Sequence, residues 1–556
     1  MTGAEILIHA LKQEGVSVIF GYPGAALCAL YDAILDHEIR HILVRHEQAA
    51  AHAADAYARA SGQAGVCLAT SGPGATNLVT GIANAYMDSI PLVVLTGQVS
   101  SELLGTDSFQ EADITGITMP ITKHSYIVKQ AADIPRIVKE AFYIARSGRP
   151  GPVLIDLPKT VLAEENVPLQ TPVLQLKSYK VFSKGNHGQI VEAAKALATS
   201  QKPVLYIGGG VVTSGAEAIL KTLTETANIP VVTTLMGIGA LPYQHPNFLG
   251  MVGMHGTVAA NYAVHECDVL LAVGVRFDDR VTSGLNHLFA TKAKVIHIDI
   301  DPAEIGKVVR AHIPIVGDAR LVLEGISARL LSLEPPEVGA WRRQIRQWQE
   351  EYPLRHHTVG SLSPQKIIAT IGEIAGGEAI VTTDVGQHQM WTAQYYPATR
   401  PRHFISSGGL GTMGFGLPAA IGAQVAAPEK TVFVIAGDGS LQMNIQELAT
   451  VTQHALPVKI ALINNGVLGL VRQWQKLFFA QRYSHCQLTG NPDFIKLAAA
   501  YGIPGLRVTA DDQVEAALRE AVACPGPFLL DFVISPEEDV FPMVPPGKEI
   551  TEILGR

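Results

Sequence analysis

Cysteine is scarce in this chain. Five cysteines are scattered along 556 residues, and no two form a C-x-x-C pair. Few, unpaired cysteines argue against a disulfide framework and against a zinc–thiolate site. They are typical of reduced thiols, so we expect a cytoplasmic protein. The five are Cys28, Cys67, Cys267, Cys486 and Cys524.

Long runs of one residue type are also missing. No apolar run reaches the roughly 20 residues that a membrane-spanning helix needs. No basic cluster is long enough to follow a phosphate backbone, and 42 Lys plus Arg stand against 50 Asp plus Glu. We therefore expect neither a membrane nor nucleic acid as a partner. We expect no targeting peptide at the N-terminus, because Thr2 and Glu5 have the spacing of a helix capping box and no basic n-region precedes them.

Short Val/Ile/Leu runs that end in glycine and lead into helical patterns recur along the chain. Examples are "VSVIFGYPG", "PLVVLTGQ", "PVLYIGGG" and "TVFVIAGDG". Such runs predict buried parallel strands alternating with helices, which is an α/β fold. Two polar or proline-bearing stretches, near 163–180 and 331–341, interrupt the pattern. They predict three doubly wound parallel-sheet domains, at 1–165, 186–335 and 360–545.

Two glycines flank one aspartate in "AGDGSLQMNIQEL". "TVFVIA" before it should be a strand, "NIQELATVTQHA" a helix, and "VKIALI" the next parallel strand. Since ligands bind at the carboxyl ends of such strands, Asp438 and Asn465 should converge there. Their oxygens suit Mg²⁺. The bare glycine backbone would admit a diphosphate, with Ser440 and a helix N-terminus offering N–H groups.

By itself the GDG tripeptide is better explained as an ordinary turn after a strand. The strand context, the 24 residues between Gly439 and Asn464, and the paired Asn465 favour a binding motif. The pattern resembles the thiamine-diphosphate motif, in which GDG is followed about 25 to 30 residues later by NN.

A thiazolium cofactor needs a carboxylic acid beside its aminopyrimidine ring. Glu47 follows the strand-like "HILV" and begins an alanine-rich helix, which is where thiamine-diphosphate enzymes carry that glutamate. Taken alone, Glu47 is more simply a first-turn acid favoured by the helix dipole. A zinc motif H-E-x-x-H is excluded because Ala50 stands at the second histidine position and His52 is out of register.

Over essentially its whole length the sequence resembles the large catalytic subunit of bacterial acetohydroxyacid synthases (acetolactate synthases), a thiamine-diphosphate enzyme family. The stretches that carry the resemblance include "FGYPGA", "RHEQAAAHAADAYARASG", "TSGPGATNLVTGIA", "GVRFDDRVT", "GLGTMGFGLPAAIGA" and "LGLVRQWQKLFF". The resemblance implies the thiamine-diphosphate-enzyme fold.

The implied reaction is the decarboxylation of pyruvate on thiamine diphosphate. The hydroxyethyl carbanion is then joined to pyruvate or 2-ketobutyrate, which gives 2-acetolactate or 2-aceto-2-hydroxybutyrate in branched-chain amino-acid (valine, leucine and isoleucine) biosynthesis. Two enzyme alternatives stay open, an FAD-independent catabolic acetolactate synthase and a pyruvate oxidase-like enzyme. A third alternative is a non-catalytic nucleotide-binding or scaffold protein of the same fold.

The resemblance also implies site residues. Glu47, Gln110 and Lys159 would be catalytic, and Gly24, Phe109, Met390 and Trp474 would contact substrate. Trp474 would favour 2-ketobutyrate as second substrate, although it could also be a core aromatic on a helix. Mg²⁺ would be bound by Asp438, Asn465 and the main-chain oxygen of Val467. Thiamine diphosphate would be lined by Tyr22, Pro23, Glu47, Pro73, Asn77, Gln387, His388, Gly411, Met413, Gly437, Asp438, Gly439, Ser440, Asn465, Val467, Leu468 and Gly469.

The middle block distinguishes this family from its relatives. "YIGGG" is a weak dinucleotide fingerprint because Thr213 stands at the third glycine position. With other stretches it resembles the family's FAD-binding domain, in which the flavin has a structural role. The implied FAD residues are Arg149, Gly208, Gly209, Gly210, Thr233, Leu235, Met236, Met254, His255, Gly256, Gly274, Arg276, Asp278, Arg280, Asp299, Ile300, Gly317, Asp318 and Ala319.

In this family the two halves of each active site usually come from different subunits. The resemblance therefore implies a homodimer at minimum, and it leaves open a tetramer and a separate small regulatory subunit. The small-molecule partners it implies are 2-keto acids.

Overall fold

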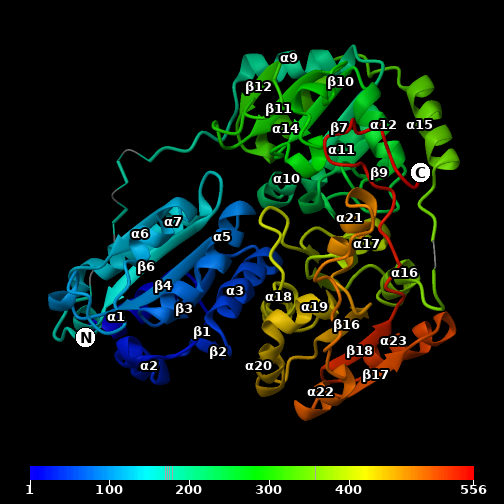
Figure 1. The fold of residues 1–556 in the computed structure, drawn as a ribbon. Coiled ribbons are helices and arrows are strands. Elements are labelled where there is room, and N and C mark those ends of the chain that lie inside the picture. Colours follow the sequence, from blue (N-terminus) through cyan, green and yellow to red (C-terminus); the bar gives the residue numbers. More distant parts are fainter. Residues whose placement is uncertain (170, 172, 175, 178, 357–358) are drawn as a thin grey trace.

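The structure, a computed structural model, describes all residues except 170, 172, 175, 178, 357 and 358. The described residues form three six-stranded sheets, and neighbouring strands are parallel in each (Figure 1). The predicted α/β fold of three parallel-sheet domains is confirmed. No helix in the described part of the chain is both long and apolar enough to cross a membrane.

The first sheet has the strand order β2-β1-β3-β4-β6-β5. Thr2 and Glu5 form the predicted capping box at the start of α1. The strands are β1 (Val18–Gly21), β2 (Arg40–Leu43), β3 (Gly65–Ala69), β4 (Leu92–Gln98), β5 (His124–Ile127) and β6 (Pro152–Pro158). The helices are α1 (Gly3–Gln13), α2 (Cys28–Leu35), α3 (Glu47–Ser61), α4 (Pro73–Asn77), α5 (Val79–Met87), α6 (Ile114–Thr118), α7 (Ile134–Arg146) and α8 (Lys159–Ala163).

The second sheet has the order β12-β11-β10-β7-β8-β9. Its strands are β7 (Pro203–Ile207), β8 (Val231–Thr233), β9 (Phe248–Met251), β10 (Val269–Val273), β11 (Lys294–Asp299) and β12 (Ile313–Val316). Its helices are α9 (His187–Ala198), α10 (Gly209–Ser214), α11 (Glu217–Ala227), α12 (Val258–Glu266), α13 (Asp279–Thr282) and α14 (Ala319–Leu330). Helix α15 (Gly339–Glu351) follows and packs on α12.

The third sheet has the order β14-β13-β15-β16-β18-β17. Its strands are β13 (Ile380–Thr383), β14 (Phe404–Ile405), β15 (Val432–Gly437), β16 (Lys459–Asn464), β17 (Gly505–Val508) and β18 (Phe528–Val533). Its helices are α16 (Pro364–Ile374), α17 (Gln387–Tyr395), α18 (Gly416–Ala426), α19 (Asp438–Leu441), α20 (Leu448–Gln453), α21 (Gly469–Phe478), α22 (Phe494–Ala500) and α23 (Val514–Ala523). The C-terminal segment then returns to the second block, where Val544 N donates to Met254 O.

The first and third blocks interlock through α3 and α18. Small residues face each other here, and a Cβ added at Gly422 would overlap the carbonyl oxygen of Ala53. One continuous core cluster therefore contains residues of both sheets. The three sheets lie within the three predicted domain ranges, whose limits stay a prediction.

One predicted element is wrong. The stretch from Asn444 onward was expected to form a single helix, but a 3₁₀ segment (Gln442–Glu447) with a kink at Asn444 precedes α20. Asn444 has φ −133° and ψ 31°, and its side chain donates to Gly414 O at 2.7 Å. The asparagine amide thus hydrogen-bonds a carbonyl of another segment, and the main chain at Asn444 departs from helical geometry.

Candidate active site

The predicted metal-binding residues lie at the ends of two adjacent strands. β15 and β16 are paired in parallel, with Gly437 opposite Ile463, so Asp438 and Asn465 follow neighbouring strand ends. Burial raises the pKa of the Asp438 carboxyl, while the Asn491 side chain and the main-chain N–H groups of Asp438, Gly466 and Asn465 lower it. The structure therefore brings Asp438 and the Asn465 turn together. A cation would offset the cost of burying this carboxylate.

Asn491 orients that carboxylate. Its Nδ2 donates to Asp438 Oδ2 at 2.6 Å, and Gln442 Nε2 donates to both Asp438 O and Asn491 Oδ1 at 2.9 Å. No sequence signal pointed to Asn491, which lies 53 residues from Asp438 and belongs to no motif.

The glycines beside Asp438 leave room that a side chain would fill. A Cβ at Gly437 would lie 2.8 Å from His388 Nδ1, and one at Gly439 would lie 2.8 Å from Leu468 Cδ2. His388 is buried and its Nε2 has no hydrogen-bond partner among the described residues. Burial lowers the pKa of His388 to about 3, so the ring is neutral. The unpartnered Nε2 of this buried ring fits a bound ligand.

Gln387 connects the Asn465 turn to the rest of the third block. Asn465 Nδ2 donates to Gln387 Oε1 at 3.3 Å, and Gln387 Nε2 donates to Gln473 Oε1 at 3.0 Å. A Cβ at Gly469 would overlap Gln387 Oε1. Val467 N donates to Asn465 Oδ1 at 3.1 Å. The predicted residues 465, 467 and 469 thus form one compact turn against Gln387.

Glu47 is the first residue of α3, and other predicted residues surround it. Asn77 Nδ2 donates to Glu47 Oε2 at 2.9 Å, and a Cβ at Gly74 would lie 3.3 Å from Glu47 Oε1. A Cβ at Gly24 would overlap Thr70. The loops "GYPG" and "TSGPG" and the start of α3 therefore meet, as the resemblance implied. Tyr22 and Pro23 belong to the first of these loops and Pro73 to the second.

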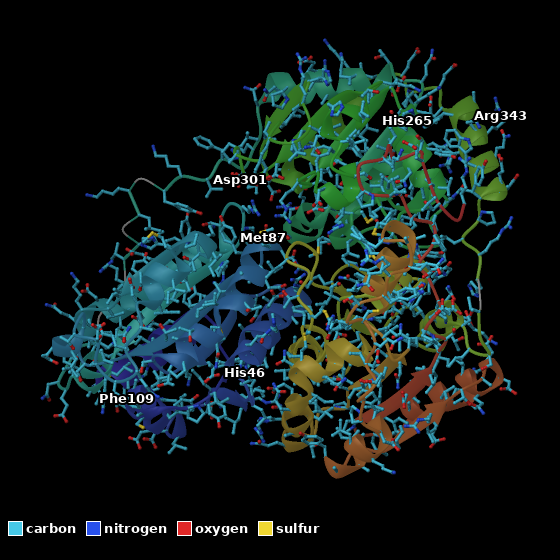
Figure 2. The ribbon with its side chains drawn as sticks, in the orientation of Figure 1. His46, Met87, Phe109, His265, Asp301 and Arg343 are labelled. Carbon is cyan, nitrogen blue, oxygen red and sulfur yellow. The ribbon has the colours of Figure 1, made fainter. Side chains whose placement is uncertain are left out.

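Within this chain Trp474 is separated from Phe109, Gln110 and Lys159, which the resemblance implied to contact substrate or to be catalytic. Gln110, with φ +60°, packs against Gly72, since a Cβ there would lie 2.8 Å from Gln110 O. Phe109 is 88% exposed on the outer side of the first block, away from the second and third (Figure 2). Lys159 is exposed at the start of α8. Neither Phe109 nor Lys159 lines the large cavity described next.

A cavity of about 1140 Å³ lies where the three blocks meet. The first block contributes Asp88 and Arg149, and the third contributes Met390, Gly411 and Trp474. Fifteen of the nineteen residues expected to bind FAD line it: Arg149, Gly209, Gly210, Leu235, Met236, Met254, His255, Gly274, Arg276, Asp278, Arg280, Asp299, Ile300, Asp318 and Ala319. The other four, which do not line it, are Gly208, Thr233, Gly256 and Gly317.

Bare glycines shape the floor of this cavity. A Cβ at Gly210 would lie 2.6 Å from Gly274 Cα, and one at Gly208 would lie 2.5 Å from Gly274 O. Gly208 thus lets the ends of β7 and β10 approach each other. His255 Nε2 is buried without a hydrogen-bond partner among the described residues, and burial lowers the pKa of His255 to about 4. The volume and this unpartnered nitrogen fit a large ligand.

Charged groups at the cavity edge join the first block to the second. Arg149 Nη1 lies 2.8 Å from Glu304 Oε1, and Arg149 Nε donates to Ser89 Oγ at 2.8 Å. Burial raises the pKa of Asp299 to about 6. Met87 and Asp301 lie on facing sides of this junction (Figure 2).

Trp474 is half-buried on α21. Its ring packs edge-on against Phe478, with centroids 5.5 Å apart, and the guanidinium of Arg280 lies 5.8 Å from the indole centroid. Met390 on α17 and Trp474 line the same cavity. Met413 lies in the loop that leads from β14 to α18.

A buried ionic network that was not predicted from the sequence holds this loop. Arg59 pairs with Asp55 at 2.6 Å and with Asp88 at 2.9 Å, and it donates to Ser406 O at 2.9 Å. Asp88 also accepts from the main-chain N–H groups of Gly408, at 3.0 Å, and Gly409, at 2.6 Å. The only sequence signal was the i, i+4 spacing of Asp55 and Arg59 on an expected helix.

The chain was compared with known proteins. It matches the N-terminal TPP binding domain of thiamine pyrophosphate enzymes over residues 1–117, their central domain over 190–326 and their C-terminal TPP binding domain over 384–532. It is 52% identical to the probable acetolactate synthase large subunit of Methanocaldococcus jannaschii, with 100% of this chain and 95% of that protein covered.

Other relatives carry the same description. The chain is 49% identical to the acetolactate synthase isozyme 2 large subunit of Escherichia coli, covering 99% of that protein, and 51% identical to an acetolactate synthase large subunit of Mycobacterium tuberculosis, covering 91%. Identity of about half over the whole length accompanies the three matched domains and the site geometry. The chain therefore belongs to the acetolactate synthase large-subunit family of thiamine pyrophosphate enzymes.

Proposed function

We propose that this acetolactate synthase decarboxylates pyruvate and joins the remaining two-carbon unit to a second 2-keto acid. With pyruvate as acceptor the product is 2-acetolactate, and with 2-ketobutyrate it is 2-aceto-2-hydroxybutyrate. These compounds lead to valine, leucine and isoleucine. The observation that carries the proposal is the pairing of Glu47 with Asn77 in a chain that also places Asp438 and Asn465 at adjacent strand ends.

The residues at both ends of the site fit thiamine diphosphate with Mg²⁺. When bound, this cofactor supplies an electron sink for decarboxylation. Asp438, Asn465 and the carbonyl of Val467 would hold the cation, and the bare main chain at Gly437 and Gly439 would admit the diphosphate. Glu47 would hold a proton at its carboxyl, and Asn77 orients it by donating to Oε2.

FAD is proposed for the cavity between the blocks, with a structural role. Gly210 and Gly274 leave the floor bare, and His255 offers a buried nitrogen without a partner. Visible flavin absorbance that stays with the protein through gel filtration would support this assignment. Colourless protein that is fully active without FAD would contradict it and favour a catabolic, FAD-independent enzyme.

We also propose that two copies of the chain build each site, since Phe109 and Lys159 lie away from Trp474 within one copy. A separate small regulatory subunit is proposed because the relatives are described as large subunits. A cytoplasmic location remains part of the proposal.

The direct test is product analysis with pyruvate and 2-ketobutyrate in competition, with and without FAD. Glu47→Gln should lower acetolactate formation at least about 100-fold, the usual contribution of a positioned acid–base group. Glu520→Gln, an exposed acid on α23, is the control and should keep the wild-type rate. Near-full activity in Glu47→Gln would show that the role given to Glu47 is wrong. Oxygen uptake with pyruvate in place of acetolactate would favour an oxidase.

A further inference from the structure

The main chain that carries Glu47 is held by the third block of the same chain. The N–H groups of Arg45 and His46 donate to one oxygen of Glu447, Oε1, at 2.9 and 3.1 Å. His46 is the N-cap of α3, and its side chain accepts from Gln48 N. Glu447 therefore fixes two consecutive peptide groups directly before Glu47, although about 400 residues separate them in sequence.

Further contacts hold the same short segment. His454 Nε2 accepts from Leu43 N at 3.1 Å, and Arg45 Nη2 donates to Gln453 Oε1 at 2.6 Å. The Thr450 hydroxyl lies 3.2 Å from Leu43 O. Residues 447–454 thus hydrogen-bond to Leu43, Arg45 and His46 in the segment that joins β2 to α3. Figure 2 shows His46 where the first and third blocks face each other.

Glu447 is itself fixed. Its side chain is fully buried, and its second oxygen lies 2.7 Å from the Thr450 hydroxyl. Burying a carboxyl costs free energy that an apolar residue would not, even with three donors around it. A buried acid is therefore poorly explained as a packing residue here. It is better explained by the need for an oxygen that accepts both N–H groups.

We propose that Glu447 is a positioning residue for Glu47, fixing the direction in which the first turn of α3 presents the Glu47 carboxyl to the cofactor. The inference rests on the proposed function of Glu47. The segment from Asp438 to His454 then has two roles, since Asp438 is a proposed metal ligand and Glu447 positions the Glu47 carboxyl. If Asp438 and Glu47 of one copy belong to two different active sites of a dimer, this segment joins the two sites.

The test uses the full-length protein reconstituted with thiamine diphosphate and Mg²⁺. Glu447→Ala should slow deuterium exchange at the reactive carbon of the cofactor, and kcat, by about 10 to 100-fold, because small misplacements of a catalytic group cost this much. KM for pyruvate should change little. In the cofactor-free protein, amide exchange over residues 43–48 should speed up as well.

Glu447→Gln should rescue all three readouts. Its amide oxygen can accept from both N–H groups while its NH₂ donates to the Thr450 hydroxyl, which can accept instead of donating. The matched control is Glu140→Ala, another buried acid, which accepts from Tyr126 and Arg136. Glu140 belongs to α7, whose core cluster is not the one that contains α3. Glu140→Ala should therefore leave deuterium exchange at the reactive carbon of the cofactor unchanged.

Wild-type cofactor exchange and wild-type amide protection in Glu447→Ala would overturn the proposal, as would an equal loss in Glu140→Ala. If Glu447→Ala does not fold, Glu447→Asp keeps a carboxyl group but moves its oxygens back by one methylene. It should lower the exchange rate several-fold, and a wild-type rate there would also overturn the proposal. Failure of Glu47→Gln to slow cofactor exchange would instead contradict the role given to Glu47.

Discussion

Asp156 is a buried carboxyl on β6, which lies between β4 and the edge strand β5 of the first sheet. It accepts from Thr96 Oγ1 at 2.7 Å and from Gln98 Nε2 at 3.0 Å. Burial raises its pKa from 3.8 to about 7, and the charge of Asp113 adds to the effect. The folded protein therefore keeps this proton up to about pH 7, whereas the unfolded chain loses it near pH 4.

Asp156→Asn should consequently change how stability depends on pH. In the wild type, Asp156 lowers the free energy of unfolding as pH rises from about 4 to 7, by roughly 4 kcal/mol at most. Asparagine does not titrate, and it can still accept from Gln98 while donating to the Thr96 hydroxyl. Thermal unfolding between pH 5 and 7.5 should show a smaller fall in Tm for Asp156→Asn than for the wild type. Asp32→Asn, at an exposed position, is the control, and an unchanged pH dependence in Asp156→Asn would contradict the assignment.

Trp474 gives a prediction on substrate choice. Its indole lines the cavity beside Met390, and an apolar wall that packs one extra methylene of 2-ketobutyrate is worth about 1 to 3 kcal/mol. Trp474→Leu should lower the preference for 2-ketobutyrate over pyruvate about 5 to 150-fold, with the pyruvate-only rate less affected. Competition assays that measure the two products give this ratio. An unchanged ratio would mean that Trp474 is only a packing residue.

Sequence patterns predicted the residues whose role depends on local context. Asp438 was predicted from the spacing of GDG and NN, and Glu47 from its place after a strand together with the resemblance to thiamine-diphosphate enzymes. Asn491 and Glu447 could not be found in this way, because each acts on a partner that only the folded chain brings close. The hydrogen bond from Arg59 to Ser406 O could not be predicted either, because only the folded chain brings these two residues close.

At the scale of elements, α3 and α18 are packed so closely that one methyl group should matter. Gly422→Ala would place a Cβ on the carbonyl oxygen of Ala53, a main-chain atom that can move only with its helix. Overpacking of this kind costs about 1 to 3 kcal/mol, so Tm should fall by several degrees. Gly526→Ala is the control, since a Cβ there meets nothing within 4 Å. A wild-type Tm for Gly422→Ala would show that the two helices can separate without cost.

Strands were easier to predict than helices in this chain. The expected strands "TVFVIA" and "VKIALI" became β15 and β16 with shifts of one residue, because buried parallel strands are continuous apolar runs. The helix expected between them starts with a 3₁₀ turn and becomes α-helical only at Leu448. Its first residue, Asn444, is kinked, and the Asn444 side chain donates to the carbonyl of Gly414, 30 residues away. Local periodicity carries no information about such a partner.

At the scale of the whole molecule, the large cavity could not be predicted from any one block. Arg149, His255 and Trp474 come from the first, second and third blocks, and only their arrangement makes one cavity. Fifteen of the nineteen residues expected to bind FAD line this cavity, and their role in binding stays a prediction. The resemblance did not reveal that Gly208 packs against Gly274 and does not line the cavity, because glycine would be needed for close packing and for lining the cavity alike.

Sharing of active sites between subunits can be tested by mixing two inactive variants. Glu47→Gln lacks the carboxyl proposed to hold a proton and Asp438→Ala lacks the proposed metal ligand, so each should be inactive alone. If each site takes Glu47 from one copy and Asp438 from the other, a mixed dimer has one doubly altered site and one intact site. Unfolding and refolding an equal mixture should then restore about a quarter of wild-type activity, because half of the dimers are mixed.

The amount of recovered activity distinguishes the two arrangements. If Glu47 and Asp438 of the same copy served one site, every site in the mixture would carry one alteration and acetolactate formation would stay at the level of the single variants. A double variant, Glu47→Gln with Asp438→Ala, mixed with wild type is the control, because its mixed dimers have no intact site under the shared arrangement. Such dimers should be inactive when separated by a tag on one copy, whereas unshared sites would leave them half active.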